Sequence, residues 1–141
     1  YWGDIHLQNF GEKRGSQISP VKDAIDYGMK YTFHQDTPVI PPDMMRTISS
    51  AVNRISRGGR VIGENQKISV LDALKAVTIY AAYQYFEEHE KGSIECGKYA
   101  DFVVLEKNPL KTPKEELAEI KVWMTIKENE VIYRSGEANH E

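Results

Sequence analysis

A short run at residues 30–39 constrains the fold of this chain more than any other stretch. β-Branched and aromatic residues at 30–33 favour a strand, and Pro38 ends it because proline has no N–H to donate. Asp36 lies at the tip of this run, between helical patterns at residues 19–27 and 42–57. The order helix, strand, acidic tip, helix predicts one turn of an α/β barrel, in which the carboxyl ends of strands carry the active site.

Asp36 nevertheless has two interpretations at this point. An aspartate after a strand more often caps a turn or the following helix. Its role therefore depends on the rest of the chain.

One further helix and a small sheet are expected. Residues 42–57 carry apolar side chains at helical spacing, and residues 69–86, capped by Ser69, are apolar on nearly all sides, which predicts a buried helix. Residues 93–94 and 101–105 have the pattern of strands. A short helical turn at 113–120 precedes a hairpin whose strands, 122–126 and 131–133, join across Glu128 and Asn129.

The first 15 residues are expected to form a loop, because glycines recur at positions 3, 11 and 15. This stretch carries Trp2 and Arg14, two side chains able to bind a substrate. The alternative is an aromatic loop that packs on a neighbouring element.

Composition excludes several classes of function. The chain has 141 residues and a net charge of −3 with scattered basic residues, so no nucleic-acid partner is expected. No apolar run approaches the ~20 residues that cross a membrane. The one cysteine, Cys96, excludes an intrachain disulfide and fits the cytoplasm. The start at Tyr1, without Met, is expected of a fragment that lacks the amino-terminal part of its parent.

Three segments carry a resemblance that spans nearly the whole chain. Residues 91–105 read K-G-S-I-E-C-G-K-Y-A-D-F-V-V-L, which resembles the carboxyl-terminal signature of the amidohydrolase superfamily, and residues 71–82 resemble the helix before it. The motif D-T-P-V that begins at Asp36 is similar to amidohydrolase family 3. Trp2 and Arg14 also fit this branch.

The resemblance implies an α/β fold: a carboxyl-terminal fragment of a (β/α)8 TIM-barrel amidohydrolase. Residues 1–88 would belong to the metal-dependent hydrolase barrel, and residues 89–141 to the small β-sandwich beside it. In the sandwich, Gly92 and Gly97 would serve tight turns. Lys98 and Asp101 are expected to be scaffold rather than catalytic residues.

For Asp36 the resemblance implies a catalytic role and a metal-binding role. In such enzymes this aspartate binds a divalent metal, with zinc expected here, and takes a proton from the metal-bound water. His34 shares its face of the strand and would either contact substrate or fill the barrel. The family's H-x-H motif and its later ligands have no counterpart here, so the chain alone is expected to be inactive.

The implied function of the parent is hydrolysis of a C–N bond in a small molecule: an amide, a cyclic amide or an N-acyl compound. The alternative is a non-catalytic regulatory or interaction module built from the same segment. Because a lone barrel strand has unpaired edges, residues 30–33 are expected to pair with the sheet or with another copy of the chain. Self-association into a homo-oligomer is therefore expected.

Overall fold

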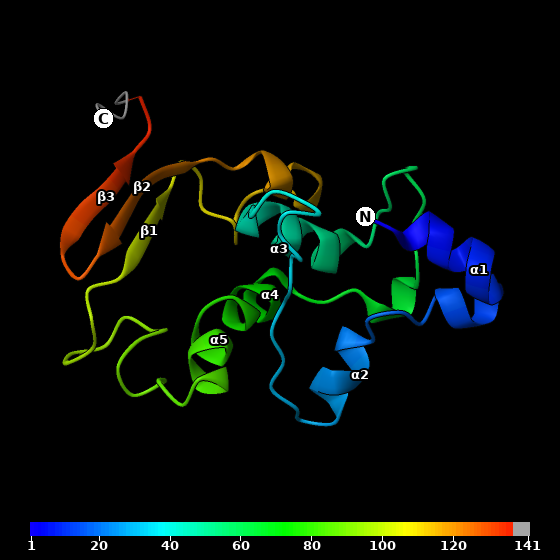
Figure 1. Cartoon of the computed structure of the whole chain (residues 1–141), viewed down its shortest axis with the longest axis horizontal. Helices are drawn as coiled ribbons and strands as arrows, with labels where there is room; N and C mark the ends of the chain where they lie inside the picture. The colour runs from blue at the N-terminus through cyan, green and yellow to red at the C-terminus, as the bar shows by residue number, and fades with distance from the viewer. Residues whose placement is uncertain (137–141) are drawn as a thin grey trace.

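The computed structural model describes residues 1–136, which form a mixed α/β arrangement with the sheet at one end and α1 at the other (Figure 1). The α-helices are α1 (Gly3–Gly15), α2 (Val21–Asp26), α3 (Met44–Asn53), α4 (Val70–Ala76) and α5 (Ile79–Gln84). Two 3₁₀ helices, η1 (Glu64–Gln66) and η2 (Lys114–Glu119), and three strands, β1 (Phe102–Leu105), β2 (Val122–Lys127) and β3 (Glu130–Arg134), complete it. No helix in residues 1–136 is long and apolar enough to cross a bilayer.

The core forms where α3 packs on η2 and α4. Met45, Ile48 and Val52 recur at helical spacing and are buried on one face of α3. They meet Leu117 and Ile120, which the turn of η2 carries into the same cluster. The apolar stripe predicted at residues 42–57 is thus core from Met45 to Val52, but the helix ends at Asn53, and Met44 and Ile55 are exposed.

The sheet is antiparallel with strand order β1-β2-β3. Phe102 pairs with Ile126 across the first ladder, and Met124 pairs with Arg134 across the second. The predicted strand at 101–105 and the hairpin are confirmed. Asn129 has a φ of 69°, the left-handed conformation that the turn requires.

The strand predicted at residues 30–33 is wrong, and so is its pairing with the sheet. Residues 29–36 form no strand, and the sheet contains β1, β2 and β3 alone within residues 1–136. Side chains hold the segment instead: the Tyr31 hydroxyl donates to the carbonyl of Asp72 at 3.3 Å, and the Thr32 hydroxyl to Oε1 of Gln84 at 2.7 Å. A β-strand needs the backbone of a neighbouring strand as its hydrogen-bond partner. Residue propensity favours an extended segment but does not provide that neighbour.

Three other expectations are also wrong. Residues 3–15 are helical rather than a loop, with a kink at Gly11, where φ is 74°. Residues 69–86 form two helices, α4 and α5, separated at Thr78, and Phe86 is 85% exposed rather than buried. Residues 93–94 form no strand. Nearly uniform apolarity marked a helical region correctly but could not locate its break.

Candidate functional site

Asp36 begins an exposed loop, residues 36–42, between the extended segment and α3. Its Oδ1 lies 3.4 Å from Nε2 of His34, and the two side chains are 71% and 84% exposed. The backbone of Asp36 has a φ of 58°, a left-handed conformation that Asp tolerates better than most residues. The structure therefore brings together the two residues that the sequence placed on one face.

Hydrogen bonds give this loop a defined shape. The N–H of Val39 donates to the carbonyl of Asp36 at 2.8 Å, which closes a tight turn. At the base, Oε1 of Gln35 accepts from the N–H of Asp43 at 2.8 Å, and Nε2 donates to the Asp43 carbonyl at 2.5 Å. Asp43 also caps α3, because its carboxylate accepts from the N–H of Arg46 at 3.0 Å.

His34 and Asp36 carry donor types that a metal site uses. Asp36 offers a carboxylate and His34 an imidazole, which are ligand types for zinc and similar cations. No group of three or more His, Cys, Asp or Glu side chains able to hold a metal exists in the described part of the chain, residues 1–136. The pair fits a divalent metal only if further ligands come from outside these residues, because a hydrolytic zinc needs about three protein ligands.

Trp2 and Arg14 lie at the two ends of α1 and are not joined to Asp36. Trp2 precedes the first turn and meets Tyr1 edge to face, with ring centroids 5.0 Å apart. Arg14 is exposed in the last turn. Their assignment to substrate binding stays a prediction.

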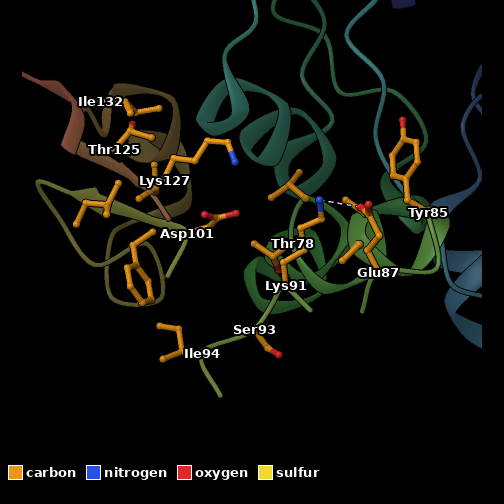
Figure 2. A pocket seen from close by; sticks show the side chains of 17 residues that line it. Thr78, Tyr85, Glu87, Lys91, Ser93, Ile94, Asp101, Thr125, Lys127 and Ile132 are labelled. Atoms are coloured by element: carbon orange, nitrogen blue, oxygen red, sulfur yellow. Dashed lines mark ion pairs between the residues drawn. The ribbon is translucent and has the colours of Figure 1, made fainter. Parts of the chain in front are cut away.

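A groove of about 940 Å³ lies between α5, the segment at residues 91–94 and the sheet (Figure 2). Lys91 and Glu87 form an ion pair of 2.7 Å on the helical side, and this hydrogen bond raises the pKa of Lys91. On the sheet side, Asp101 accepts from the N–H of Glu128 at 2.8 Å. Lys91, Glu87 and Asp101 thus bond to other groups of the chain, and we assign them a structural role in the groove.

Lys98 and Asp101 both make hydrogen bonds within the chain that suit the expected scaffold role. The ammonium of Lys98 lies largely buried and donates to the carbonyl of Glu88 at 2.5 Å and to Oγ of Ser93 at 2.6 Å. Gly92 and Gly97 have φ values of 91° and 90°, which only glycine adopts readily, so the turns that they form depend on glycine.

The family comparison matches this signature and the Asp36 loop in one alignment. A sequence model described as the amidohydrolase family covers residues 3–133. The chain belongs to the amidohydrolase family. Among curated relatives, the N-substituted formamide deformylase of Arthrobacter pascens is 28% identical over 137 residues, which are 96% of this chain and 25% of that protein. Protein LONG AFTER FAR-RED 3 of Arabidopsis thaliana is 40% identical over 74 residues, which are 52% of this chain and 13% of that protein.

A solved structure supports the fold. An amidohydrolase from Thermotoga maritima MSB8 superposes with a TM-score of 0.61 and 22% identity, over 81% of this chain and 25% of that one. At this identity the likeness concerns the fold alone. The amidohydrolase chain spans about a quarter of the length of the deformylase and of this structural neighbour.

Sequence reasoning missed Gln35, although it lies between two residues that were singled out. A glutamine beside a predicted metal ligand carries no motif, and its value comes from contacts with Asp43 and Thr47, which are 8 and 12 residues away. The signal available was indirect: Pro38, Pro41 and Pro42 leave few backbone donors to hold the loop.

Proposed function

We propose that this chain is the carboxyl-terminal part of a longer metal-dependent amidohydrolase that cleaves C–N bonds of small molecules in the cytoplasm. The observation that carries the proposal is the exposed His34–Asp36 pair in a chain that the amidohydrolase model matches over residues 3–133. In this proposal residues 1–88 belong to a TIM barrel, and residues 89–141 to a small β-sandwich.

Asp36 is proposed as the residue that binds the metal and moves the proton. A divalent metal, with zinc as the first choice for mixed carboxylate and imidazole ligands, would supply a water of lowered pKa at the site. An Asp36 carboxylate oxygen accepts a proton from the attacking water and returns it to the leaving nitrogen, as a general base and then a general acid. His34, 3.4 Å from that carboxylate, orients it or contacts substrate.

The family and one relative support the proposed substrate class. That relative is named an N-substituted formamide deformylase, and a deformylase of this kind cleaves the C–N bond of an N-acyl compound. We therefore rank N-acyl amides ahead of cyclic amides. Trp2 and Arg14 are proposed to bind substrate, since an aromatic ring and a guanidinium suit an acyl group and an adjacent carboxylate.

The test is Asp36→Asn in the full-length protein that contains this chain. We expect the variant to lose more than about 100-fold in kcat/KM on N-acyl substrates, the scale of a lost acid–base group, and to lose bound metal. Asp26→Asn is the matched control, because Asp26 is an exposed aspartate that contacts Lys22 on α2. Activity of Asp36→Asn within tenfold of the parent would refute the proton role. A full-length protein with neither metal nor hydrolysis would favour a non-catalytic module.

A further inference from the structure

We infer that Gln35 is the positioning residue for Asp36: its carboxamide holds the base of loop 36–42 and so fixes where the Asp36 carboxylate stands. This inference rests on the proposed function of Asp36. It adds a residue that never touches substrate and acts through its neighbour.

The contacts of Gln35 are those of a clamp. Its Oε1 accepts from the N–H of Asp43 at 2.8 Å, and its Nε2 donates to the carbonyl of the same residue at 2.5 Å. Nε2 also donates to the hydroxyl of Thr47. One side chain thus satisfies both backbone groups of residue 43, as a neighbouring antiparallel strand would do.

The clamp is attached to a firm part of the molecule. Asp43 is the N-cap of α3, and its carbonyl also accepts from the N–H of Thr47 at 3.1 Å. One turn further, Met45 and Ile48 are buried in the core cluster. Gln35 therefore ties the loop to the best-packed helix of the chain.

Asp36 depends on this attachment because little else restrains it. Its carboxylate is exposed, and its side-chain partner is His34, which is more exposed still. The bonds within the loop, from Val39 N–H to the Asp36 carbonyl and from the Thr37 hydroxyl to the Ile40 carbonyl at 3.2 Å, hold the shape of the loop but not its place. Without Gln35 the loop is free to swing as a unit.

Displacement of the Asp36 carboxylate should slow the reaction. A displacement of about 1 Å between catalytic groups can cost about 100-fold in rate. Because Gln35 adjoins Asp36 in the chain, loss of the clamp moves the carboxylate directly. Substrate contacts made elsewhere are untouched, so the loss should fall on kcat rather than on KM.

The experiment compares Gln35→Leu with Gln84→Leu in the full-length protein. Gln84 is the matched control, since its amide accepts from Thr32 just before the site and makes no bond with residues 36–43. We expect Gln35→Leu to lower kcat more than tenfold with KM within threefold. We also expect it to change the visible absorption of the cobalt(II)-loaded protein, which reports ligand geometry. Gln84→Leu should change neither.

A kcat and a cobalt spectrum of Gln35→Leu that match those of Gln84→Leu would overturn the inference. If Gln35→Leu does not fold, Gln35→Glu provides the test. This variant keeps the acceptor for the Asp43 N–H but loses the two hydrogen bonds that Nε2 donates. An unchanged kcat and an unchanged cobalt spectrum would then overturn the inference. Asp36→Asn, measured beside them, separates the two claims. An inactive Asp36→Asn with a normal Gln35→Leu refutes the positioning role of Gln35 alone, whereas an active Asp36→Asn refutes the proposed role of Asp36.

Discussion

The backbone N–H of Glu128 donates a 2.8 Å hydrogen bond to Oδ1 of Asp101, so the hairpin turn between β2 and β3 is fastened to the start of β1. A second bond lies beside it, from the N–H of Asn129 to the carbonyl of Ala100 at 3.1 Å. Both turn residues have positive φ, 50° and 69°. The aspartate thus stabilises a turn that lies 27 positions further along the chain.

Asp101→Ala should lower the free energy of unfolding by about 1 kcal/mol, because it removes a partly solvated hydrogen bond to a carboxylate. Asp101→Asn keeps an acceptor oxygen and should recover most of this loss. Urea denaturation measures both values. Asp26→Ala is the control, since Asp26 makes an exposed ion pair with Lys22 that contributes about 0.5 kcal/mol or less. Equal effects of Asp101→Ala and Asp26→Ala would contradict the role of this bond.

The part of the fold that sequence predicted well is the part built from local rules. Ser69 accepts from the N–H of Asp72 at 3.1 Å, as the capping pattern indicates. Asn129 takes the turn conformation expected of it, and the alternating residues of β2 and β3 pair as predicted. Each of these features is decided within a few residues.

The features that sequence could not predict depend on distant partners. Residues 30–33 have the propensity of a strand, yet no neighbouring strand lies beside them in residues 1–136. The sequence grouped His34 with Asp36 by the spacing of a strand. The two side chains do meet, although residues 29–36 form no strand and Asp36 has a left-handed φ of 58°. Gln35 was not found, since its partners Asp43 and Thr47 lie 8 and 12 residues away in the chain.

Arg54→Lys should destabilise the chain by about 2 kcal/mol, the scale of lost hydrogen bonds to a charged group. The guanidinium donates to three backbone carbonyls, those of Ile18 at 2.7 Å, Ser19 at 3.1 Å and Ile62 at 2.6 Å, and thereby joins the end of α3 to the chain after α1. Burial lowers the pKa of Arg54, but a guanidinium stays charged. A lysine ammonium cannot reach the three acceptors in this planar arrangement.

Thermal and urea unfolding of Arg54→Lys would measure this loss. Arg46→Lys provides the control, because Arg46 is an exposed arginine on the same helix. Should the two variants be equally stable, the three carbonyl contacts would not contribute to the stability of the fold.

Ionisation of Tyr31 should lower the free energy of unfolding as the pH rises from about 10 to about 12. Burial, and next the Asp72 carboxylate, raise the pKa of the Tyr31 phenol from 10.0 to about 12. The unfolded chain therefore loses this proton first as the pH rises, so the contribution of Tyr31 is complete below pH 10 and is lost by about pH 12. Because the side chain is partly solvated, we expect the free energy of unfolding to fall by about 1 kcal/mol, which is less than the full pKa shift would give.

Urea denaturation of the parent and of Tyr31→Phe at several pH values across this window would isolate the effect. A phenylalanine side chain cannot ionise, so the difference between the two stabilities should change by about 1 kcal/mol across the window while other groups cancel. A difference independent of pH would contradict the raised pKa.

The isolated chain should bind no stoichiometric zinc. His34 and Asp36 supply two ligands, and no third His, Cys, Asp or Glu joins them among residues 1–136. Two exposed ligands give weak association, in contrast to the three or four of a structured zinc site. Isothermal titration with zinc should show no tight binding to the unmodified 141-residue chain, and the same weak heat for its His34→Ala variant. A single tight site that His34→Ala abolishes would mean that ligands outside residues 1–136 complete the site, or that two chains pool their ligands.

The last prediction is that the chain self-associates through its sheet. Within residues 1–136, β1 and β3 each pair with β2 and form the two edges of the sheet. All five residues of β3 are exposed, including Val131, Ile132 and Tyr133. An edge strand that exposes apolar side chains is a surface on which another strand can pair. Each such side chain left in water forgoes roughly 1.5–3 kcal/mol, a large share of the about 5–15 kcal/mol that stabilises a domain.

Ile132→Lys should shift the chain towards the monomer, because a lysine on an edge strand is the usual protection against pairing. Tyr27→Lys is the matched control: Tyr27 is 83% exposed but follows α2, far from the sheet in the chain. Light scattering across a concentration series should give a mass above 16.1 kDa for the parent and for Tyr27→Lys, and a mass close to it for Ile132→Lys. A parent chain that stays monomeric throughout the series would show that these edges are protected without a partner.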